Sequence, residues 1–233
     1  MPPPGASLGR RAGAILVAAG ESRRMQGADK LFMSLLGRPL LSYALAAFEA
    51  CHSIVDIVLV VRAENLERGR RLVQEGGFAR VAAVCEGGPR RQDSVRLGLE
   101  RLPASPWVVV HDGARPCVQP ELIEEGLTMA ERFGCAVAAV PLYDTVKRVD
   151  GGGQVEETLD RLHLWAVQTP QVFPREWLSK AHQLRDVTAT DDAALVERLG
   201  YPVHVYLGSP MNIKVTTPQD LLLAEAVLRS RGR

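Results

Sequence analysis

The sequence has few cysteines, and these lie far apart along the chain. Among 233 residues there are four, namely Cys51, Cys85, Cys117 and Cys135, and none is in the C-x-x-C spacing of zinc sites or redox dithiols. A chain of this length buries a full hydrophobic core without covalent crosslinks. The cysteines therefore indicate buried thiols in a reducing compartment, and we expect a cytoplasmic protein.

Long hydrophobic runs and an excess of charge are also absent. No apolar run approaches the roughly 20 residues of a membrane-spanning helix. The net charge of +1 gives the chain no general affinity for nucleic acid or for an anionic membrane. Residues 1–11 lack the apolar segment of a secretory signal. We expect residues 1–11 to be a disordered tail, with a very short transit peptide as the alternative, and residues 12–233 to form one domain.

Two common nucleotide-binding motifs are missing. The first strand-like run ends at Gly20, but Glu21 and Ser22 follow it, so the G-x-G-x-x-G fingerprint of dinucleotide-binding proteins is not formed. The pattern G-x-x-x-x-G-K-[ST] occurs nowhere, which excludes a P-loop NTPase. A dehydrogenase that binds NAD is therefore disfavoured, and any phosphate site needs another construction.

The chain alternates strand-like and helix-like segments. We predict strands at residues 14–18, 54–61, 81–85, 107–110, 135–141 and 203–207, and helices at 40–50, 64–75, 93–102, 121–133, 176–183, 191–199 and 218–229. The β-branched run at 54–61 is typical of a strand that is buried on both faces. This alternation predicts an α/β fold, with a doubly wound, mostly parallel, Rossmann-like sheet and helices on both faces.

The alternation breaks between about residues 142 and 165. Residues 143–149 and 154–158 flank three consecutive glycines at 151–153, which predicts a hairpin that leaves the sheet as a protruding β-arm. Such an arm either exchanges contacts between subunits or is a solvated excursion. After the arm, we expect Lys214 to lie on a short strand and Thr217 to cap the last helix, with Pro218 in its first turn.

The unusual polar residues follow the predicted strands. Ala18, Ala19 and Gly20 end the first strand, and Arg24 and Lys30 come soon after. Small residues let a backbone approach a ligand closely, and cations beyond them indicate an anion, most simply a chain of phosphates. Further strand ends carry Arg90 and Arg91, then Asp112 and Arg115, then Asp144 and Lys147. Ligands of parallel sheets bind beyond the carboxyl ends of the strands, so these ends predict one site.

These motifs resemble a known family. Ala18-Ala19-Gly20 with Arg24, Met25 and Lys30 is similar to the nucleotidyltransferase signature of enzymes that activate sugar phosphates and alditol phosphates. Five later segments narrow the resemblance to the 2-C-methyl-D-erythritol 4-phosphate cytidylyltransferases of the non-mevalonate isoprenoid pathway: GGPRRQDSV (87–95), VHDGARP (110–116), DTVKRV (144–149), LDRLHLWAVQTPQVF (159–173) and NIKVTTPQDL (212–221). The resemblance covers nearly the whole chain and is to the monofunctional form of these enzymes.

The resemblance implies a reaction and a set of site residues. CMP passes from CTP to 2-C-methyl-D-erythritol 4-phosphate by in-line attack on the α-phosphate, and pyrophosphate leaves. The implied CTP-binding residues are Ala18, Ala19, Gly20, Lys30, Gly88, Ser94 and Gly113, with Arg24 and Lys30 as transition-state stabilisers. The implied residues for the methylerythritol phosphate are Asp112, Arg115, Thr145, Arg161, Thr169, Thr190 and Lys214, of which Arg161 and Lys214 position its phosphate.

The resemblance also implies a cofactor and a partner. Mg²⁺ is the expected cofactor, with Asp112 as its candidate ligand, and a homodimer is expected to form through the β-arm. The sequence departs from the family at Ser22, where a second glycine is usual, and at Leu31, where glutamine is common.

Alternatives remain at this stage. A ribitol 5-phosphate cytidylyltransferase shares the CTP half of the site, and a non-catalytic nucleotide-binding regulator would bind CTP without turnover. Single residues also have simpler interpretations: Asp112 as the cap of a turn, Thr190 as the N-cap of the 191–199 helix, Arg24 and Lys214 as surface cations. His111 follows a valine run, and we interpret it as a packed core residue.

Overall fold

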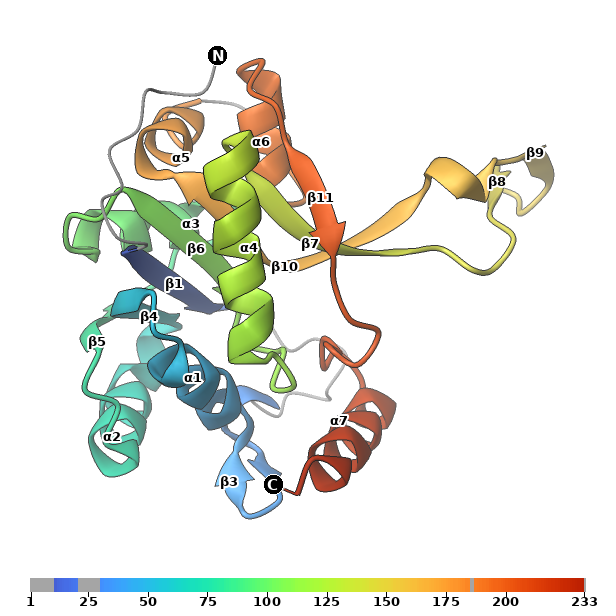
Figure 1. The fold of residues 1–233 in the computed structure, drawn as a ribbon. Coiled ribbons are helices and arrows are strands. Elements are labelled where there is room, and N and C mark those ends of the chain that lie inside the picture. The colour runs from blue at the N-terminus through green and yellow to red at the C-terminus, as the bar shows by residue number, and fades with distance from the viewer. Residues whose placement is uncertain (1–10, 21–29, 185–186, 233) are drawn as a thin grey trace.

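A seven-stranded sheet forms the centre of the molecule in a computed structural model of the chain, which describes residues 11–20, 30–184 and 187–232. In spatial order, the strands are β11 (His204–Leu207), β7 (Ala136–Pro141), β10 (Trp165–Pro174), β6 (Trp107–Asp112), β1 (Ala12–Ala18), β4 (Ile54–Val61) and β5 (Val81–Glu86) (Figure 1). The pairs β1–β4, β1–β6, β4–β5 and β7–β11 are parallel. The predicted mostly parallel α/β sheet is confirmed.

Helices cover both faces of this sheet (Figure 1). On one face lie α1 (Leu40–Ala50), α2 (Leu66–Gly76), α4 (Pro120–Phe133) and α7 (Pro218–Ser230), and on the other lie α3 (Arg91–Arg101), α5 (Arg175–Ala181) and α6 (Asp192–Arg198). Side chains of a strand point alternately to the two faces. In β1, Ala14 and Leu16 therefore join the first core while Ile15 joins the second. All three are fully buried, which explains the continuous apolar run.

One strand runs against the others. β10 pairs antiparallel with β6 on one side and with β7 on the other. Its sequence contains Gln168, Thr169, Pro170 and Gln171, and the pairing with β7 shifts register between Val167 and Gln171. Polar residues and a proline interrupt the hydrophobic pattern of a buried strand, so the sequence did not predict this element. Because β10 lies between β7 and β6, it places these polar side chains beside the carboxyl end of β6.

Capping residues fix the helix ends that the sequence predicted. The Thr217 hydroxyl accepts from the Asp220 N–H, and the Asp220 carboxylate accepts from the Thr217 N–H, so α7 begins with a reciprocal capping box. At the end of α2, Gly77 has φ 65°, a left-handed conformation that glycine adopts without strain. Its N–H donates to the Gln74 carbonyl at 3.2 Å. The predicted Thr217 cap is confirmed, and the structure adds the glycine cap of α2.

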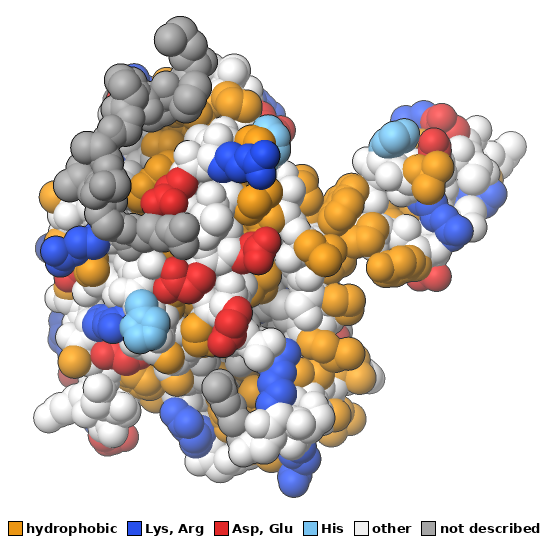
Figure 2. All heavy atoms as spheres, in the orientation of Figure 1, with side chains coloured by type: hydrophobic (Ala, Val, Ile, Leu, Met, Phe, Trp, Pro, Cys, Tyr) orange, Lys and Arg blue, Asp and Glu red, His pale blue; other side chains and the backbone are white. Residues whose placement is uncertain are grey.

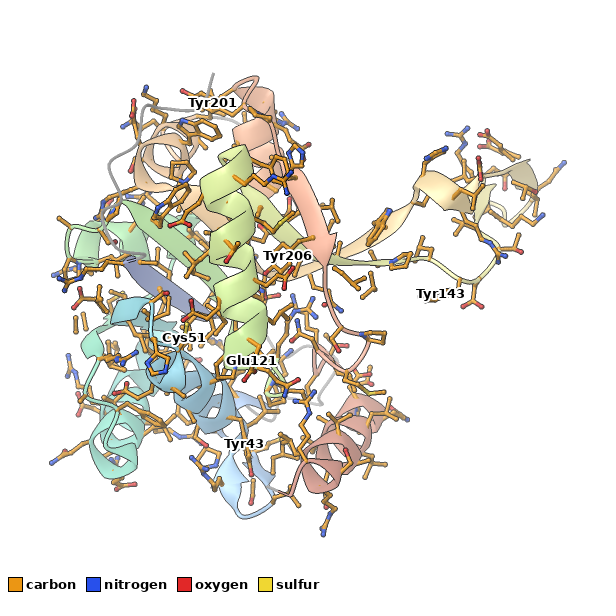
Figure 3. The ribbon with its side chains drawn as sticks, in the orientation of Figure 1. Tyr43, Cys51, Glu121, Tyr143, Tyr201 and Tyr206 are labelled. Carbon is orange, nitrogen blue, oxygen red and sulfur yellow. The ribbon has the colours of Figure 1, made fainter. Side chains whose placement is uncertain are left out.

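The hairpin predicted at 143–158 is present as β8 (Lys147–Val149) and β9 (Val155–Thr158), followed by the short 3-10 helix η4 (Arg161–His163). Figure 1 shows that this β-arm projects away from the sheet. Hydrophobic side chains gather where the arm leaves the body (Figure 2), and Tyr143, labelled in Figure 3, is 74% exposed. Leu162 on the arm is 79% exposed. The arm thus leaves large apolar side chains uncovered by its own chain.

Other short elements complete the described chain: η2 (Lys30–Phe32), a small hairpin of β2 (Ser34–Leu35) and β3 (Arg38–Pro39), and η3 (Ala63–Asn65). The strand expected around Lys214 is wrong, because residues 211–217 form a loop between β11 and α7. Tyr206 of β11 packs against α4, where its hydroxyl donates to the Leu122 carbonyl at 3.1 Å (Figure 3). In the part of the chain described, no helix has the length and apolar character that a membrane crossing requires.

Candidate active site

The carboxyl ends of β1 and β6 meet at small residues. Val17 pairs with Asp112 in the parallel ladder, and the N–H of Gly113 donates to the Val17 carbonyl at 2.9 Å. A Cβ atom on Gly113 would lie 3.3 Å from the Cβ of Ala18 and 2.8 Å from a methyl of Leu41. The backbone therefore turns here in a space that glycine fills and a larger residue does not.

A second glycine turn packs against the end of β1. Residues 87–90 connect β5 to α3, and a Cβ on Gly87 would lie only 2.4 Å from the Cβ of Ala19. Ser94 holds this turn from inside, because its buried hydroxyl accepts from the Gly88 N–H at 3.1 Å. Gly20 lies beyond β1, is exposed and has open space around its Cα. These positions bring small residues together at the ends of β1 and β5, where a ligand could approach the backbone closely.

Asp112 lies at the centre of a group of cations. Its Oδ2 is 2.8 Å from Nζ of Lys214 and 3.7 Å from Nε of Arg115, and its Oδ1 accepts from Nε of Arg91 at 3.3 Å. Lys214 comes from the loop before α7 and Arg91 from the start of α3. Residues from three separate segments thus meet on one carboxylate at the end of β6.

These ion pairs set the charge of Asp112. Burial alone would raise the pKa of its carboxyl, but Arg91, Lys214 and Arg115 outweigh that effect and hold the pKa far below its ordinary range. Burial lowers the pKa of Arg115, although Asp112 counteracts this shift. Arg91 shows the opposite balance: burial would lower its pKa, but Asp192 and Asp112 raise it overall. Asp112 is therefore ionised at neutral pH and needs its cations.

The loop that carries Lys214 is held by buried hydrogen bonds. Arg115 donates from its guanidinium to the Asn212 carbonyl at 2.7 Å, and the Asn212 amide donates to the Thr169 carbonyl at 2.8 Å. Gln168 donates to the Ser209 carbonyl at 2.9 Å. Since these groups are buried, the loop is fixed to β10 and β6 even though it is not a strand. These hydrogen bonds explain why Lys214 is held close to Asp112 although it lies on a loop.

A pocket of about 190 Å³ opens between these elements. It is lined by five of the residues that the resemblance assigned to the methylerythritol phosphate, namely Asp112, Arg115, Thr169, Thr190 and Lys214. The Thr169 hydroxyl accepts from the Asp112 N–H at 3.0 Å and contacts the His111 Nδ1 at 3.1 Å. Thr190 is exposed at the rim. The N-cap interpretation of Thr190 is wrong, because Asp191 caps α6 by accepting from the Ala194 N–H.

His111 has the core position that the sequence indicated. Its side chain is fully buried beside Phe48, with ring centroids 5.0 Å apart. Burial, opposed in part by the Asp112 charge, lowers the pKa of His111 to about 3. A neutral imidazole in this position packs behind the pocket and orients Thr169.

The same pocket is lined by polar residues that the sequence did not assign to it. These are Arg91, Gln168, Gln171 and Asp191. Arg91 belongs to the glycine-rich segment at 87–95, where it is adjacent to Arg90. In the structure Arg90 pairs with Asp93, whereas Arg91 points to the pocket and contacts Asp112. The sequence alone does not distinguish these two arginines. The TPQ segment of β10 was the available signal for Gln171, whose amide donates to Asp191 at 2.7 Å.

Two predicted substrate residues lie elsewhere in this chain. Thr145 and Arg161 are exposed on the β-arm, where the Arg161 guanidinium donates to the Tyr143 carbonyl. Figure 1 shows this arm extending away from the sheet, so the pocket of one chain does not include them. Lys30 begins η2 and is half-buried, next to Leu31, which packs into the core and so accounts for an apolar residue there. Arg24 lies outside the described residues.

The described residues offer little for a metal ion on their own. Within residues 11–20, 30–184 and 187–232, no three His, Cys, Asp or Glu side chains come together as a set of metal ligands. At the pocket, both oxygens of Asp112 already contact cations. Mg²⁺ prefers oxygen ligands and keeps waters or phosphate oxygens among them. The side chains that the structure describes therefore do not form a preorganised magnesium site on their own.

A mostly parallel sheet, glycine turns at the end of its first strand and a pocket with three cations beside them define a nucleotidyltransferase-like α/β protein. The chain matches the family model described as "IspD: 2-C-methyl-D-erythritol 4-phosphate cytidylyltransferase" over residues 12–230. This chain belongs to that family. The predicted resemblance is confirmed.

Individual relatives agree along the length of the chain. A 2-C-methyl-D-erythritol 4-phosphate cytidylyltransferase of Dehalococcoides mccartyi is 49% identical over 226 residues, 97% of this chain and 99% of that protein. One from Geobacillus kaustophilus is 44% identical over 94% of this chain and 97% of its own length. The crystal structure of the Thermus thermophilus enzyme has a TM-score of 0.76 at 35% identity, covering 92% of this chain and 98% of that one.

Proposed function

We propose that this chain transfers CMP from CTP to 2-C-methyl-D-erythritol 4-phosphate and releases pyrophosphate. The observation that carries the proposal is the Asp112 pocket, because it joins three cations and several hydroxyl and amide groups at the sheet edge used by ligands in this class of fold. A phosphorylated polyol needs cations for its phosphate and hydrogen-bonding groups for its hydroxyls. Family membership supplies the identity of the substrates.

The CTP half of the site is proposed at the ends of β1 and β5. Ala18, Ala19 and Gly20 approach the phosphates with their backbone, and Gly88, Ser94 and Gly113 surround the cytosine and ribose, as a backbone surface with few side chains allows. The cations assigned to the reacting phosphate are Arg24 and Lys30. Positive charge at this position stabilises the charge that grows on the α-phosphate during transfer.

The other half is proposed to be the Asp112 pocket. Lys214 and Arg115 face the phosphate of the methylerythritol phosphate, while Thr169, Thr190 and Asp112 bind its hydroxyls. Asp112 accepts hydrogen bonds from hydroxyl groups because it is ionised. Arg161 and Thr145 complete this half from a second subunit.

The reaction needs no general base in this scheme. An oxygen of the substrate phosphate, already anionic, attacks the α-phosphorus of CTP in line, and the bond from that phosphorus to the bridging oxygen of pyrophosphate breaks. The protein brings two polyanions together and neutralises their charge. Fixed cations serve both purposes, which fits the number of Arg and Lys residues assigned to the site.

Mg²⁺ is the proposed cofactor, and we propose that it arrives on the CTP phosphates. Phosphate oxygens and water supply most magnesium ligands in sites of this kind, with one or two carboxylates. Asp112 is the proposed protein ligand, although its contact with Lys214 would have to lengthen for an oxygen to face the metal. When bound, the ion supplies further positive charge at the transferring phosphate.

A homodimer through the β-arm is also proposed. The arm exposes Tyr143, Leu162, Val149 and Val155, all apolar or largely so, and it carries two residues assigned to a pocket that they do not reach in their own chain. Exposed apolar surface of this kind marks contact sites. Exchange of arms between two subunits would cover this surface and complete both pockets.

Residues 12–233 are proposed to act as one nucleotidyltransferase domain, with a β-arm at about 142–165.

A cytoplasmic location is proposed from the state of the cysteines. All four are free thiols, and three of them are buried. Free thiols of this kind suit a reducing compartment.

The decisive experiment measures pyrophosphate release from CTP against a panel of alditol phosphates. We expect turnover with 2-C-methyl-D-erythritol 4-phosphate and Mg²⁺, and little with ribitol 5-phosphate. A preference for ribitol 5-phosphate would assign the other cytidylyltransferase activity. CTP binding in calorimetry without turnover of any alditol phosphate would instead indicate a nucleotide-binding regulator.

A further inference from the structure

Asp192 is a fully buried carboxylate with both oxygens in use. Its Oδ2 accepts from a guanidinium nitrogen of Arg91 at 2.5 Å, and its Oδ1 accepts from Nε2 of His182 at 3.0 Å. His182 itself is also buried, at the end of α5. Burial would raise the pKa of the Asp192 carboxyl, but Arg91 and the His182 hydrogen bond outweigh that effect and hold the pKa below its ordinary value.

The partner of Asp192 is shared with the pocket. Arg91 donates to Asp192 from one nitrogen and to Oδ1 of Asp112 from Nε. A guanidinium presents its donors in a rigid planar fork, so fixing one nitrogen fixes the direction of the others. The orientation of Arg91, and through it one oxygen of Asp112, depends on a carboxylate that does not line the pocket.

We propose that His182 and Asp192 are positioning residues for the reaction, which hold Arg91 so that Asp112 faces the alditol. The series His182–Asp192–Arg91–Asp112 is termed here the positioning relay. It connects α5, the first turn of α6, the start of α3 and the end of β6. The inference rests on the proposed function, since it assigns the relay to the alditol half of the site.

The hydrogen bonds around Asp192 distinguish the positioning of Arg91 from stabilisation of the start of α6. Asp191, the neighbour of Asp192, already caps α6 and binds Gln171, so the helix start does not need Asp192 for its own hydrogen bonds. Lys214 and Arg115 contact Asp112 without any bond to His182 or Asp192. We therefore expect loss of the relay to release Arg91 from its observed direction while Asp112 keeps two of its cations.

The test compares substitutions at His182 in the full-length enzyme. His182→Gln keeps an N–H donor near the position of Nε2, whereas His182→Leu removes the donor and keeps an apolar body of similar volume. We expect His182→Leu to lower kcat/KM for the alditol phosphate by about 10-fold to 100-fold, the loss typical of one hydrogen bond to a charged group. His182→Gln should restore most of this loss. Asp192→Asn should resemble His182→Leu.

The control is His204→Leu, since His204 is an exposed histidine on β11 that stacks on Phe133 away from the pocket. Calorimetric binding of CTP should be unchanged in every variant. A structural role alone would lower the melting temperature and the active fraction but leave KM and kcat per active site unchanged, and that result would overturn the proposal. If Asp192→Asn does not fold, the pair of His182 variants decides. Absence of turnover in the wild-type enzyme would instead refute the proposed function.

Discussion

Lys214 and Asp112 form an ion pair of 2.8 Å between the loop before α7 and the end of β6. The lysine is 43% exposed at its side chain, whereas the aspartate is nearly buried. One partner is thus held rigidly by the sheet and the other reaches it from the surface. Such a pair leaves a partly exposed cation at the mouth of the pocket, where the proposed function places the phosphate of the alditol phosphate.

Lys214→Met should raise the KM for the alditol phosphate by about 10-fold to 100-fold, because one charge-assisted hydrogen bond to the phosphate is lost. Calorimetric CTP affinity should stay nearly constant. Lys180→Met is the matched control, since Lys180 is an exposed lysine on α5 that pairs with Glu176. An equal loss of CTP affinity would place Lys214 in the nucleotide half instead.

Lys30→Ala and Arg24→Ala should each reduce kcat by about 100-fold or more while CTP affinity changes little. Loss of one group that stabilises transition-state charge typically costs about 3 kcal/mol. Steady-state kinetics combined with equilibrium CTP binding measures the two effects separately. Equal losses in turnover and affinity would contradict a transition-state role.

Mixed dimers test whether the β-arm completes the pocket of another subunit. Arg161→Ala and Lys30→Ala homodimers should both be nearly inactive. In a heterodimer of the two chains, one site carries both substitutions and the other carries neither, so about half of the wild-type activity should return. Heterodimers isolated with two affinity tags and showing no recovery would argue that each site is built from one chain.

Gly87→Ala should disturb the CTP half of the site. The added methyl would lie 2.4 Å from Ala19 and 2.7 Å from the Ser94 hydroxyl, so the turn has to move. We expect a loss of about 1–3 kcal/mol in the free energy of unfolding, together with a higher KM for CTP. Gly151→Ala is the control because no atom lies within 4 Å of its added methyl, and its unfolding free energy should match the wild type.

Acid should destabilise the protein through His111. Its pKa is about 3 in the folded state and 6.5 in the unfolded state, so the unfolded chain binds more protons between these values. Stability from this residue is therefore present above about pH 6.5 and is lost as the pH falls. The expected loss is about 2 kcal/mol between pH 7 and pH 5.

Urea denaturation of the wild type and of His111→Asn at both pH values isolates this contribution. The substitution lowers stability at pH 7, but the difference between pH 7 and pH 5 should shrink by about 2 kcal/mol, because asparagine does not titrate. An unchanged difference would show that other groups govern the acid response.

The sheet and the main pocket residues were predictable for different reasons. Alternating hydrophobic segments specified β1, β4 and β6, since buried parallel strands leave a continuous apolar signal. Asp112 and Lys214 were found because recognisable motifs contain them. β10 was not predicted, because Thr169 and Pro170 interrupt its hydrophobic pattern; Thr169 lines the pocket and does not belong to the hydrophobic core.

Arg91 and Asp192 could not be assigned from sequence. Each has an adjacent residue of the same type, Arg90 and Asp191, and only the local direction of the backbone decides which one turns inward. Contacts that join α3, α5 and α6 depend on how helices pack on a sheet, which a single sequence does not specify. The proposed exchange of β-arms depends on a second subunit, so its geometry does not follow from one sequence either.

Among the described residues, charge at the pocket is balanced. Arg91, Arg115 and Lys214 contact Asp112, Arg91 also contacts Asp192, and Asp191 lines the same pocket, which makes three positive groups and three negative ones. Such a balanced cluster exerts little long-range attraction on simple anions, so cellular phosphate and sulfate gain little by entering. A ligand has to exchange partners with these groups, offering a phosphate to the cations and hydroxyls to the carboxylates at once. Under the proposed function we expect selectivity to arise from this exchange, because a ligand with phosphate alone separates ion pairs without compensation.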